Sequence, residues 1–331
     1  MTIASVFQKV SEFVEDKNQR GIADWLFSQM GSARSIPPYT EDTYFAASKV
    51  HDLCPRMETI RALHDVHLSD EIGGELQFIF DVGKLYHHLY RDWYLGPKGV
   101  YLGKWRCLAC EWTTDGNGTD DELDGGVPTR SFCPSGSYPN KRPLRMVPMP
   151  DKCPGCGAPR FRDDFTASGR AVEGEHSVIV FDEWMMVNEE HKIRAKSDGW
   201  RRSIVTGEVF NQEIKSISAF GFGKVQKTGM DWKPEHKTQS MVVTWMAGLK
   251  KGEVIYMNKA GWKSPQDIIH TCLVELDRDY IDGNVLKPIK IMRDNLRAGT
   301  LAPKLSACAS KSVPRAKRCP MADLCFKRGG K

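Results

Sequence analysis

Residues 191–218 read HKIRAKSDGWRRSIVTGEVFNQEIKSIS, and this stretch decides the fold. Its first part, residues 191–198, predicts a strand that ends at Asp198–Gly199. A turn follows at Thr206–Gly207, and residues 208–217 then alternate with the period of two that is typical of a strand. The stretch therefore predicts two neighbouring strands of a sheet.

Side chains of these two strands form a candidate metal site. Alternation puts Glu213 and Lys215 on one face of the second strand, and Asp198, at the end of the first, can approach Glu213. Carboxylate oxygens suit hard cations such as Mg²⁺ or Mn²⁺. Lys215 would orient a water molecule and offset the negative charge of a scissile phosphate.

A solvated strand face that only carries charges is the alternative interpretation. Glu-x-Lys also occurs at residues 15–17, 190–192 and 235–237. Only the pair at 213 and 215 lies inside an alternating strand downstream of an Asp-Gly strand end, so the rest of the chain has to decide between the two.

Composition predicts a globular protein with one elaborated domain or two. The chain has 331 residues, of which 40% are hydrophobic and 10% aromatic, which excludes a disordered chain. The net charge of +5 permits a polyanionic partner without requiring one. The amphipathic N-terminus and the lack of any run of 18 apolar residues predict a cytoplasmic protein without a membrane partner. In that reducing compartment the ten cysteines indicate metal before disulfide.

Helical patterns cover much of the first hundred residues. They predict helices over residues 5–30, 40–53 and 75–95, the second of which ends at Cys54-Pro55-Arg56. Gly83 and His87 share a face of the third helix, where the glycine allows close approach to a sheet and the histidine points toward it. A satisfied, partly buried histidine is the alternative for His87.

Four cysteines predict a zinc site. Cys107-x2-Cys110 and Cys153-x2-Cys156 have the spacing of two zinc knuckles, and Gly155 and Gly157 supply the tight turns that let backbone amides approach the sulfurs. The long spacer predicts a small inserted lobe with a loop that contains a spare Cys133. Zinc would either fold the insertion only or support a contact with DNA.

The second half of the chain predicts further strands at residues 177–184 and 252–259. Residues 238–248 predict a helix with Gln239 near its start, and Ser264–Pro265 predicts the start of another helix that runs through Tyr280. Cys272, inside that last helix, is expected in the core and not as a ligand.

The basic tail from Leu301 carries Cys308, Cys319 and Cys325. Three cysteines so close in a reducing compartment need a fourth ligand, and Cys54 is the natural candidate. Four thiolates suit either an iron–sulfur cluster or zinc.

Together these motifs resemble the RecB-type nucleases of the PD-(D/E)XK superfamily, and within it the iron–sulfur exonucleases that include the CRISPR-associated adaptation exonuclease and its stand-alone phage relatives. The resemblance rests on motifs in matching order over about residues 44–326: Cys54-Pro55-Arg56, Gly83-x3-His87, Asp198-Gly199, Glu213-Ile214-Lys215, Gln239, Tyr256-Met257-Asn258-Lys259 and the cysteine tail. Two features depart from the family. Val243 stands where a tyrosine is usual, and Cys308 and Cys319 are more widely spaced than the corresponding cysteines of the family.

The resemblance implies an α/β fold with a PD-(D/E)XK, restriction-endonuclease-like core, in which helices flank a mixed central sheet. It implies that His87, Asp198, Glu213 and the carbonyl of Ile214 bind Mg²⁺ or Mn²⁺, that Lys215 is the catalytic lysine and that Gln239 positions it or the strand. It also implies a [4Fe–4S] cluster on Cys54, Cys308, Cys319 and Cys325 that pins the terminus to the core. The expected organisation is a helical N-terminal part (1–104), the zinc-ribbon insertion (105–160), the nuclease core (161–300) and the basic iron–sulfur segment (301–331).

The function that the resemblance implies is a divalent-metal-dependent DNA exonuclease, acting on single-stranded DNA ends in recombination, repair or replication inside a bacterial or phage-infected cell. A recombination or replication protein is a possible partner. Arg194, Lys196, Arg201 and Arg202 are candidates for phosphate contacts, with solvated surface as the default. The rival hypothesis is a non-catalytic zinc and iron–sulfur scaffold subunit that binds DNA in a replication or transcription complex. Against that rival, the sequence keeps the complete set of His87, Asp198, Glu213 and Lys215.

Overall fold

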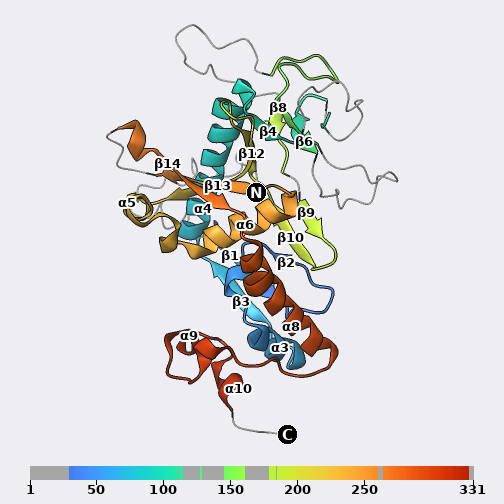
Figure 1. Ribbon diagram of the computed structural model, residues 1–331, viewed down its shortest axis with the longest axis vertical. Coiled ribbons are helices and arrows are strands. Elements are labelled where there is room, and N and C mark those ends of the chain that lie inside the picture. Colours follow the sequence, from blue (N-terminus) through green and yellow to red (C-terminus); the bar gives the residue numbers. More distant parts are fainter. Residues whose placement is uncertain are drawn as a thin grey trace, which may run out of the picture.

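The computed structural model describes residues 30–110, 112–114, 127–128, 145–160, 179–183, 185–259 and 264–327 (Figure 1). The helix predicted over residues 5–30, except its last residue, and the predicted spare Cys133 lie outside this part of the chain.

A seven-stranded mixed sheet forms the centre of the described structure, with the strand order β14-β13-β12-β11-β4-β7-β6. In that order the strands are Ile269–Glu275, Lys251–Asn258, Val209–Ile217, Gly199–Arg202, Tyr101–Gly103, Arg145–Pro148 and Val127–Pro128. Strands β12 and β13 run parallel, and the other pairs are antiparallel. The predicted α/β class with a mixed central sheet is confirmed.

Smaller sheets surround the central one. Strand β10 (Ile193–Lys196) lies between β2 (Phe45–Ala46) and β9 (Met185–Asn188), β1 (Ser32–Ile36) pairs with β3 (Leu68–Ile72), and β5 (Trp105–Cys107) pairs with β8 (Ile179–Phe181). The strand predicted over residues 177–184 is therefore confirmed for its described part, β8.

The pattern of alternation locates β12 and β13 within one residue of the predicted bounds. The strand predicted over residues 191–198 is only partly correct, because β10 leaves the central sheet and the partner of β12 is β11, which starts after Asp198. The break lies at Gly199, whose φ of +136° interrupts an extended chain.

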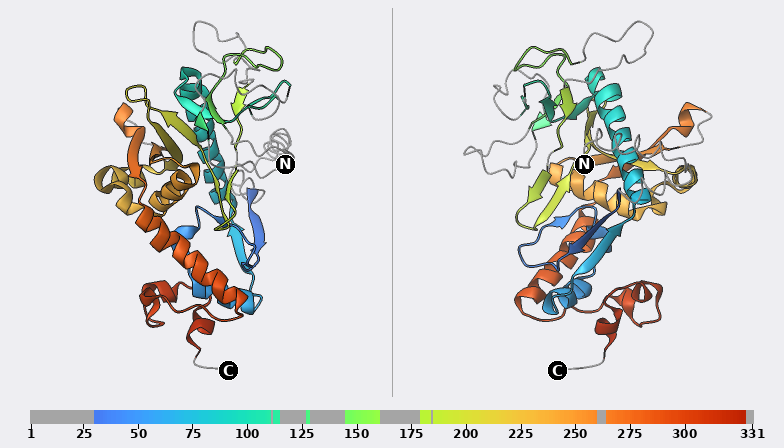
Figure 2. Two further views of the ribbon diagram at one scale, coloured as in Figure 1. Left: turned by 45° about the vertical axis from the view of Figure 1, so that its right-hand side comes forward. Right: turned by 180° about the vertical axis from the view of Figure 1, so that it is seen from behind.

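Helices cover both faces of β12. The helix predicted over residues 75–95 is confirmed: α4 (Gly74–His88) continues into a wider helical segment, Leu89–Leu95. Gly83 lies against the sheet as expected, since a Cβ there would stand 3.0 Å from the Ser216 Oγ. Helix α6 (Pro234–Ala247) contains the helix predicted from residue 238 and packs on the other face. Figure 2 shows the two helices on either side of the strands.

Two predicted helices are wrong. Residues 40–53 contain β2 and one short helical turn at Val50–Asp52, because the Phe45 amide donates to the Lys192 carbonyl and joins the chain to β10. Residues 264–280 form a turn at Pro265–Asp267, strand β14 and the short α7 (Arg278–Tyr280), because β13 needs an outer partner. Cys272 lies on β14 and packs against the core, as expected of a non-ligand.

The predicted zinc-binding insertion shares the core of the central sheet. Strands β4 and β7 extend that sheet, and Trp105, Cys107 and Cys153 belong to the same buried cluster as Ile214 and Val254. The insertion is therefore continuous with the sheet that carries Asp198 and Glu213.

The C-terminal segment returns to the N-terminal helices (Figure 1). Helix α8 (Lys287–Arg297) packs on α3 (Pro55–Leu63), and the short α9 (Pro314–Lys317) and α10 (Ala322–Phe326) follow, with α10 against α3. The remaining described α-helix is α5 (Ala219–Thr228). Among the described residues, no helix has the length and apolar character that crossing a membrane requires.

Candidate metal sites

Asp198 is held at three points. Its Oδ1 lies 3.3 Å from the Nδ1 of His87, its Oδ2 accepts a hydrogen bond of 2.8 Å from the Ile214 amide, and its backbone carbonyl accepts one from the Tyr101 hydroxyl. Helix α4 therefore delivers His87 to Asp198, as its spacing from Gly83 predicted. Ile214 is bound to Asp198 through its amide, and the ligand role expected of its carbonyl stays a prediction.

Glu213, Lys215 and Gln239 form a closed triangle of hydrogen bonds. The Lys215 Nζ lies 2.6 Å from Glu213 Oε1 and 3.1 Å from Gln239 Oε1, and Gln239 Nε2 donates to Glu213 Oε1 at 2.7 Å. Alternation along β12 brings the first two together, and the first turns of α6 bring Gln239 over them. The fold thus brings these three sequence-predicted residues together, and their catalytic roles stay a prediction.

The electrostatics of Glu213 are unusual for a structural ion pair. Burial raises the pKa of Glu213 to about 7, and the charge of Asp198 adds to that, although Lys215 opposes it. Its second oxygen, Oε2, is buried with no hydrogen-bond partner. A buried carboxylate oxygen without a partner is costly, so this atom lacks a cation or a donor.

The pKa values of Asp198 and Lys215, unlike that of Glu213, shift in the directions that keep these two groups charged. Burial opposes ionisation of Asp198, but the charges of His87 and Lys215 outweigh it and lower the pKa of Asp198 to about 2. Burial also opposes the charge of Lys215, and Glu213 and Asp198 outweigh it, so that the pKa of Lys215 is raised. The site thus combines an ionised carboxylate, a charged lysine and a carboxylate short of positive charge.

The donor set fits a hard divalent cation. Two carboxylates are the type of ligand that Mg²⁺ and Mn²⁺ prefer, and the free Oε2 of Glu213 offers the second carboxylate oxygen beside the His87 nitrogen. Among the described residues, the four zinc-type cysteines have ligand atoms that all lie within 4.8 Å of one another. His87, Asp198 and Glu213 are not drawn together as tightly as that. His87 approaches Asp198 from α4, while Glu213 turns Oε1 toward α6.

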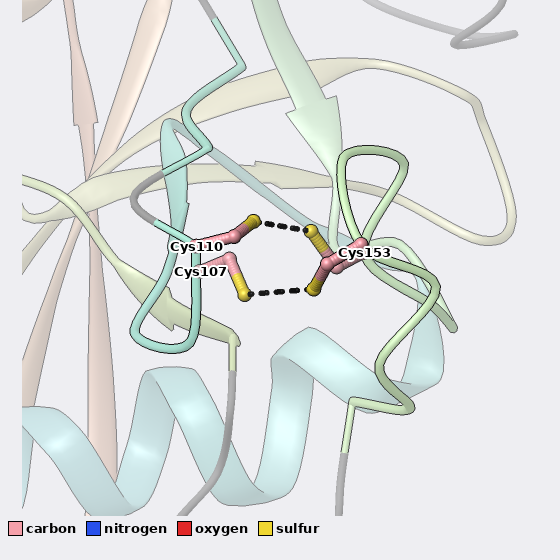
Figure 3. A group of neighbouring side chains, drawn as sticks. Cys107, Cys110 and Cys153 are labelled. Atoms are coloured by element: carbon pink, nitrogen blue, oxygen red, sulfur yellow. Dashed lines mark hydrogen bonds between the residues drawn. The ribbon is translucent and has the colours of Figure 1, made fainter.

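The four cysteines predicted as a zinc site do come together (Figure 3). Cys107 and Cys156 have sulfurs 3.8 Å apart, and Cys110 and Cys153 have sulfurs 3.5 Å apart. Zinc–sulfur bonds of about 2.3 Å in a tetrahedron separate the sulfurs by about 3.8 Å. The set therefore has the dimensions of a single tetrahedral ion.

Backbone amides support these sulfurs as the glycines predicted. The Gly155 amide lies 3.3 Å from the Cys153 sulfur, and a Cβ at Gly155 would stand 3.0 Å from the Trp112 Cβ. Gly157 adopts a φ of +71° and donates to the Cys153 carbonyl. Ala109 repeats the amide contact on Cys107 at 3.4 Å. Such amide-to-sulfur bonds are typical of metal knuckles.

The other four predicted ligands line one pocket, together with Arg56 and Met57. Cys54 stands at the N-terminal end of α3, and Cys308, Cys319 and Cys325 come from the tail, so the tail meets the start of α3 here. Arg56 closes the contact, because its Nε donates to the Cys325 sulfur at 3.3 Å and its Nη1 to the Ala302 carbonyl at 2.8 Å. Burial raises the pKa of Cys54, and the neighbouring thiol of Cys319 raises it further.

The spacing of this second cysteine set differs from that of the first. Its sulfurs do not meet the 4.8 Å separation that the zinc-type set meets. One tetrahedral ion holds its sulfurs closer than that, whereas a polynuclear cluster keeps its thiolates further apart. The four sulfurs of this second set are therefore not spaced as one tetrahedral ion would hold them.

Two of the basic residues that the sequence offered as candidates for phosphate contacts form ion pairs. Arg201 binds Glu253, and Lys196 binds Glu183 at 2.9 Å, so neither is a free phosphate contact in this arrangement. Tyr256 is buried, with its hydroxyl 3.1 Å from the Nδ1 of His236. The sequence analysis did not single out Tyr101, whose hydroxyl donates to the Asp198 carbonyl. A tyrosine in a short strand gives no sequence signal of such a contact with a residue far along the chain.

Comparison with known proteins gives limited similarity. No protein-family model and no curated protein matches the chain. Among solved structures, the alkaline exonuclease LHK-Exo from Laribacter hongkongensis aligns at 18% identity over 35% of this chain and 58% of its own, with a TM-score of 0.28. LHK-Exo in complex with dAMP aligns at 19% identity over 32% of this chain and 50% of its own, with a TM-score of 0.27. The aligned part thus spans only half or slightly more of the exonuclease chain.

Proposed function

We propose that the protein is a divalent-metal-dependent deoxyribonuclease that degrades DNA from single-stranded ends. The observation that carries this proposal is the buried Glu213, whose free Oε2 lies in a site that also holds His87, Asp198 and a charged Lys215. A purely structural ion pair would use both carboxylate oxygens, since an unmatched one costs stability.

In this mechanism His87, Asp198 and Glu213 hold Mg²⁺ or Mn²⁺, with the carbonyl of Ile214 as a further ligand. Once bound, the cation supplies Lewis-acid polarisation of the phosphate and a more acidic water. The contact of His87 with Asp198 and the amide of Ile214 fix the direction of the carboxylate before the cation arrives. Preorganisation of this kind avoids reorganisation during the reaction.

Lys215 supplies the remaining positive charge. An ammonium group has three N–H donors, and the bonds to Glu213 and Gln239 account for two of them. The third can hold the attacking water or a phosphate oxygen, as a catalytic lysine requires. Gln239 acts as a positioning residue, because it accepts from Lys215 and donates to Glu213 at the same time.

The two cysteine sets have separate structural roles in the proposal. Cys107, Cys110, Cys153 and Cys156 bind zinc, whose preferred bond lengths match the observed sulfur spacing. Cys54, Cys308, Cys319 and Cys325 hold a [4Fe–4S] cluster that closes the long loop between Cys54 and the C-terminal segment.

The substrate and setting follow from the motif resemblance. Single-stranded DNA ends are the proposed substrate, and recombination, repair or replication in the cytoplasm of a bacterial or phage-infected cell is the proposed process. A recombination or replication protein is the proposed partner. Val243, which stands where the family usually has a tyrosine, is fully buried in α6. The lack of that tyrosine concerns how the DNA strand is positioned and not the metal ligands.

The test is cleavage of end-labelled single-stranded and duplex DNA by anaerobically purified protein with Mg²⁺ or Mn²⁺. We expect metal-dependent degradation by the wild type and a loss of at least about 100-fold in Glu213→Gln, since one essential ligand charge disappears. Glu208→Gln is the matched control, because Glu208 stands just before the same strand and forms an ion pair with Lys251 near the surface. Equal activity of the two variants, or no cleavage by metal-loaded wild type, would contradict the proposal.

A further inference from the structure

Tyr101 fixes the backbone next to Asp198. Its hydroxyl donates to the Asp198 carbonyl, and its ring lies under Gly199 so closely that a Cβ there would stand 2.2 Å from the hydroxyl oxygen. The side chain is completely buried. Burial raises the pKa of Tyr101 well above its ordinary value, so the hydroxyl remains a donor.

Asp198 depends on this contact because no strand holds it. Strand β10 ends at Lys196 in one sheet, and β11 begins at Gly199 in another. The peptide between them precedes Gly199, which has a φ of +136° and whose amide donates a hydrogen bond of 3.2 Å to the Ser197 hydroxyl. The Tyr101 hydroxyl is the group that binds the Asp198 carbonyl itself, beside the two contacts of the Asp198 carboxylate and the bond from Gly199 to Ser197.

Tyr101 is in turn held by the zinc-binding part of the chain. Its ring makes edge contacts with Trp105 and Phe181, at centroid distances of 6.4 Å and 6.0 Å. Trp105 lies two residues before Cys107 in β5, and its indole nitrogen donates to the Val147 carbonyl at 2.9 Å. Val147 belongs to β7, which leads within a few residues to Cys153. Both zinc knuckles thus extend from strands that enclose Tyr101.

We infer that the zinc site positions Asp198 through Tyr101, so that zinc occupancy at the four cysteines controls the affinity of the Asp198 site for its divalent cation. This inference rests on the proposed function. Tyr101 touches neither the cation nor the substrate in this arrangement and acts through the backbone of Asp198. The zinc-binding insertion then serves the chemistry of the sheet directly.

The first experiment compares Tyr101→Phe with Tyr90→Phe. Each protein, loaded with zinc and iron, is titrated with Mn²⁺, and binding is measured by electron paramagnetic resonance. Tyr90 is a matched control: it is a buried phenol whose ring stands 6.4 Å from that of Tyr101, but its hydroxyl bonds to Gln212. We expect Tyr101→Phe to weaken Mn²⁺ binding by 10-fold or more, in the range of about 10- to 100-fold typical of outer-shell partners. Zinc content and circular dichroism should match the wild type.

Two results would overturn the inference: Mn²⁺ affinity of Tyr101→Phe within twofold of the wild type, or an equal weakening in Tyr90→Phe. Asp198→Asn separates this failure from that of the proposed function. If Asp198→Asn binds as much Mn²⁺ as the wild type, the cation site itself is absent and both fail. If it loses one site while Tyr101→Phe retains it, only the coupling fails.

The second experiment tests the zinc end. Cys156→Ser alters an exposed ligand, and Cys272→Ser is the control because Cys272 belongs to neither cysteine set. We expect Cys156→Ser to lose zinc and to weaken Mn²⁺ binding by at least 10-fold, while Cys272→Ser changes neither. A zinc-depleted Cys156→Ser that binds Mn²⁺ like the wild type would refute the coupling. Should this variant not fold, the same Mn²⁺ titration on wild-type protein depleted of zinc takes its place, with the same two outcomes.

Discussion

At the scale of single residues, the burial of Glu213 costs stability once its carboxyl group is ionised. Its pKa is raised to about 7 from 4.5, chiefly by burial, so the folded protein binds a proton there that the unfolded chain has lost. This group therefore contributes most to the stability of the folded state below pH 4.5. Its contribution is lost as the pH rises from 4.5 through 7.

Glu213→Gln should therefore stabilise the cation-free protein at pH 8, because glutamine resembles the protonated acid. The expected gain is at most about 3 kcal/mol from a shift of this size, and it should vanish toward pH 4.5. Urea unfolding without added Mg²⁺ or Mn²⁺, and without a chelator that would strip the cysteine sites, measures it.

Glu208→Gln, on the surface, should show no such dependence on pH. A Glu213→Gln protein that is less stable than the wild type at pH 8 would mean that the pair with Lys215 stabilises the ionised carboxylate more than burial penalises it.

At the scale of elements, Gly199 decides where one sheet ends and the next begins. A side chain there meets two obstacles, a φ of +136° and the Tyr101 hydroxyl 2.2 Å from the new Cβ. Gly207 shares the first obstacle, with a φ of +69°, but nothing lies within 4 Å of its Cβ position.

We expect Gly199→Ala to lower the free energy of unfolding by more than about 3 kcal/mol, since strain and overpacking add. Gly207→Ala should lower it by only about 1 kcal/mol. Denaturant unfolding of both variants checks this difference, and equal losses would show that the contact of Tyr101 with Gly199 does not constrain the chain.

The same elements show how far the sequence predicts the fold. Periodicity located β12, β13 and α4, because each has a local pattern that its packing preserves. It failed at residues 264–280, where a helix-like apolar spacing became β14 because the neighbouring edge of β13 offered hydrogen bonds. It also failed at Gly199, since the local signal of a strand end does not reveal which sheet the chain enters next.

At the scale of the whole molecule, residue types and spacing named candidate members for each site, but not the connections between sites. Four thiolates and the pairing of Glu213 with Lys215 carry their chemistry in the sequence itself. The extension of the central sheet by β4 and β7 joins segments far apart in the chain, so only the folded structure links the zinc knuckles to Asp198. Tertiary pairing of this kind has no local signature.

The proposed cluster gives the last prediction, which concerns the closure of the chain. Cys319→Ser should abolish the brown colour and the iron content, while zinc stays bound, because the two cysteine sets lie in separate parts of the structure. The tail beyond residue 301 should then become sensitive to protease.

Helix α8 should stay in place in Cys319→Ser, since its packing on α3 does not involve the cluster, and the bond from the Ala302 amide to the Thr59 hydroxyl holds the chain just beyond it. Limited proteolysis beside metal analysis measures both effects, with Cys272→Ser as the control. Because the clip removes entropy from a very long loop, its loss should lower stability before it touches the chemistry at Lys215. A colourless wild type with two zinc ions and no iron would replace the cluster with a second zinc site.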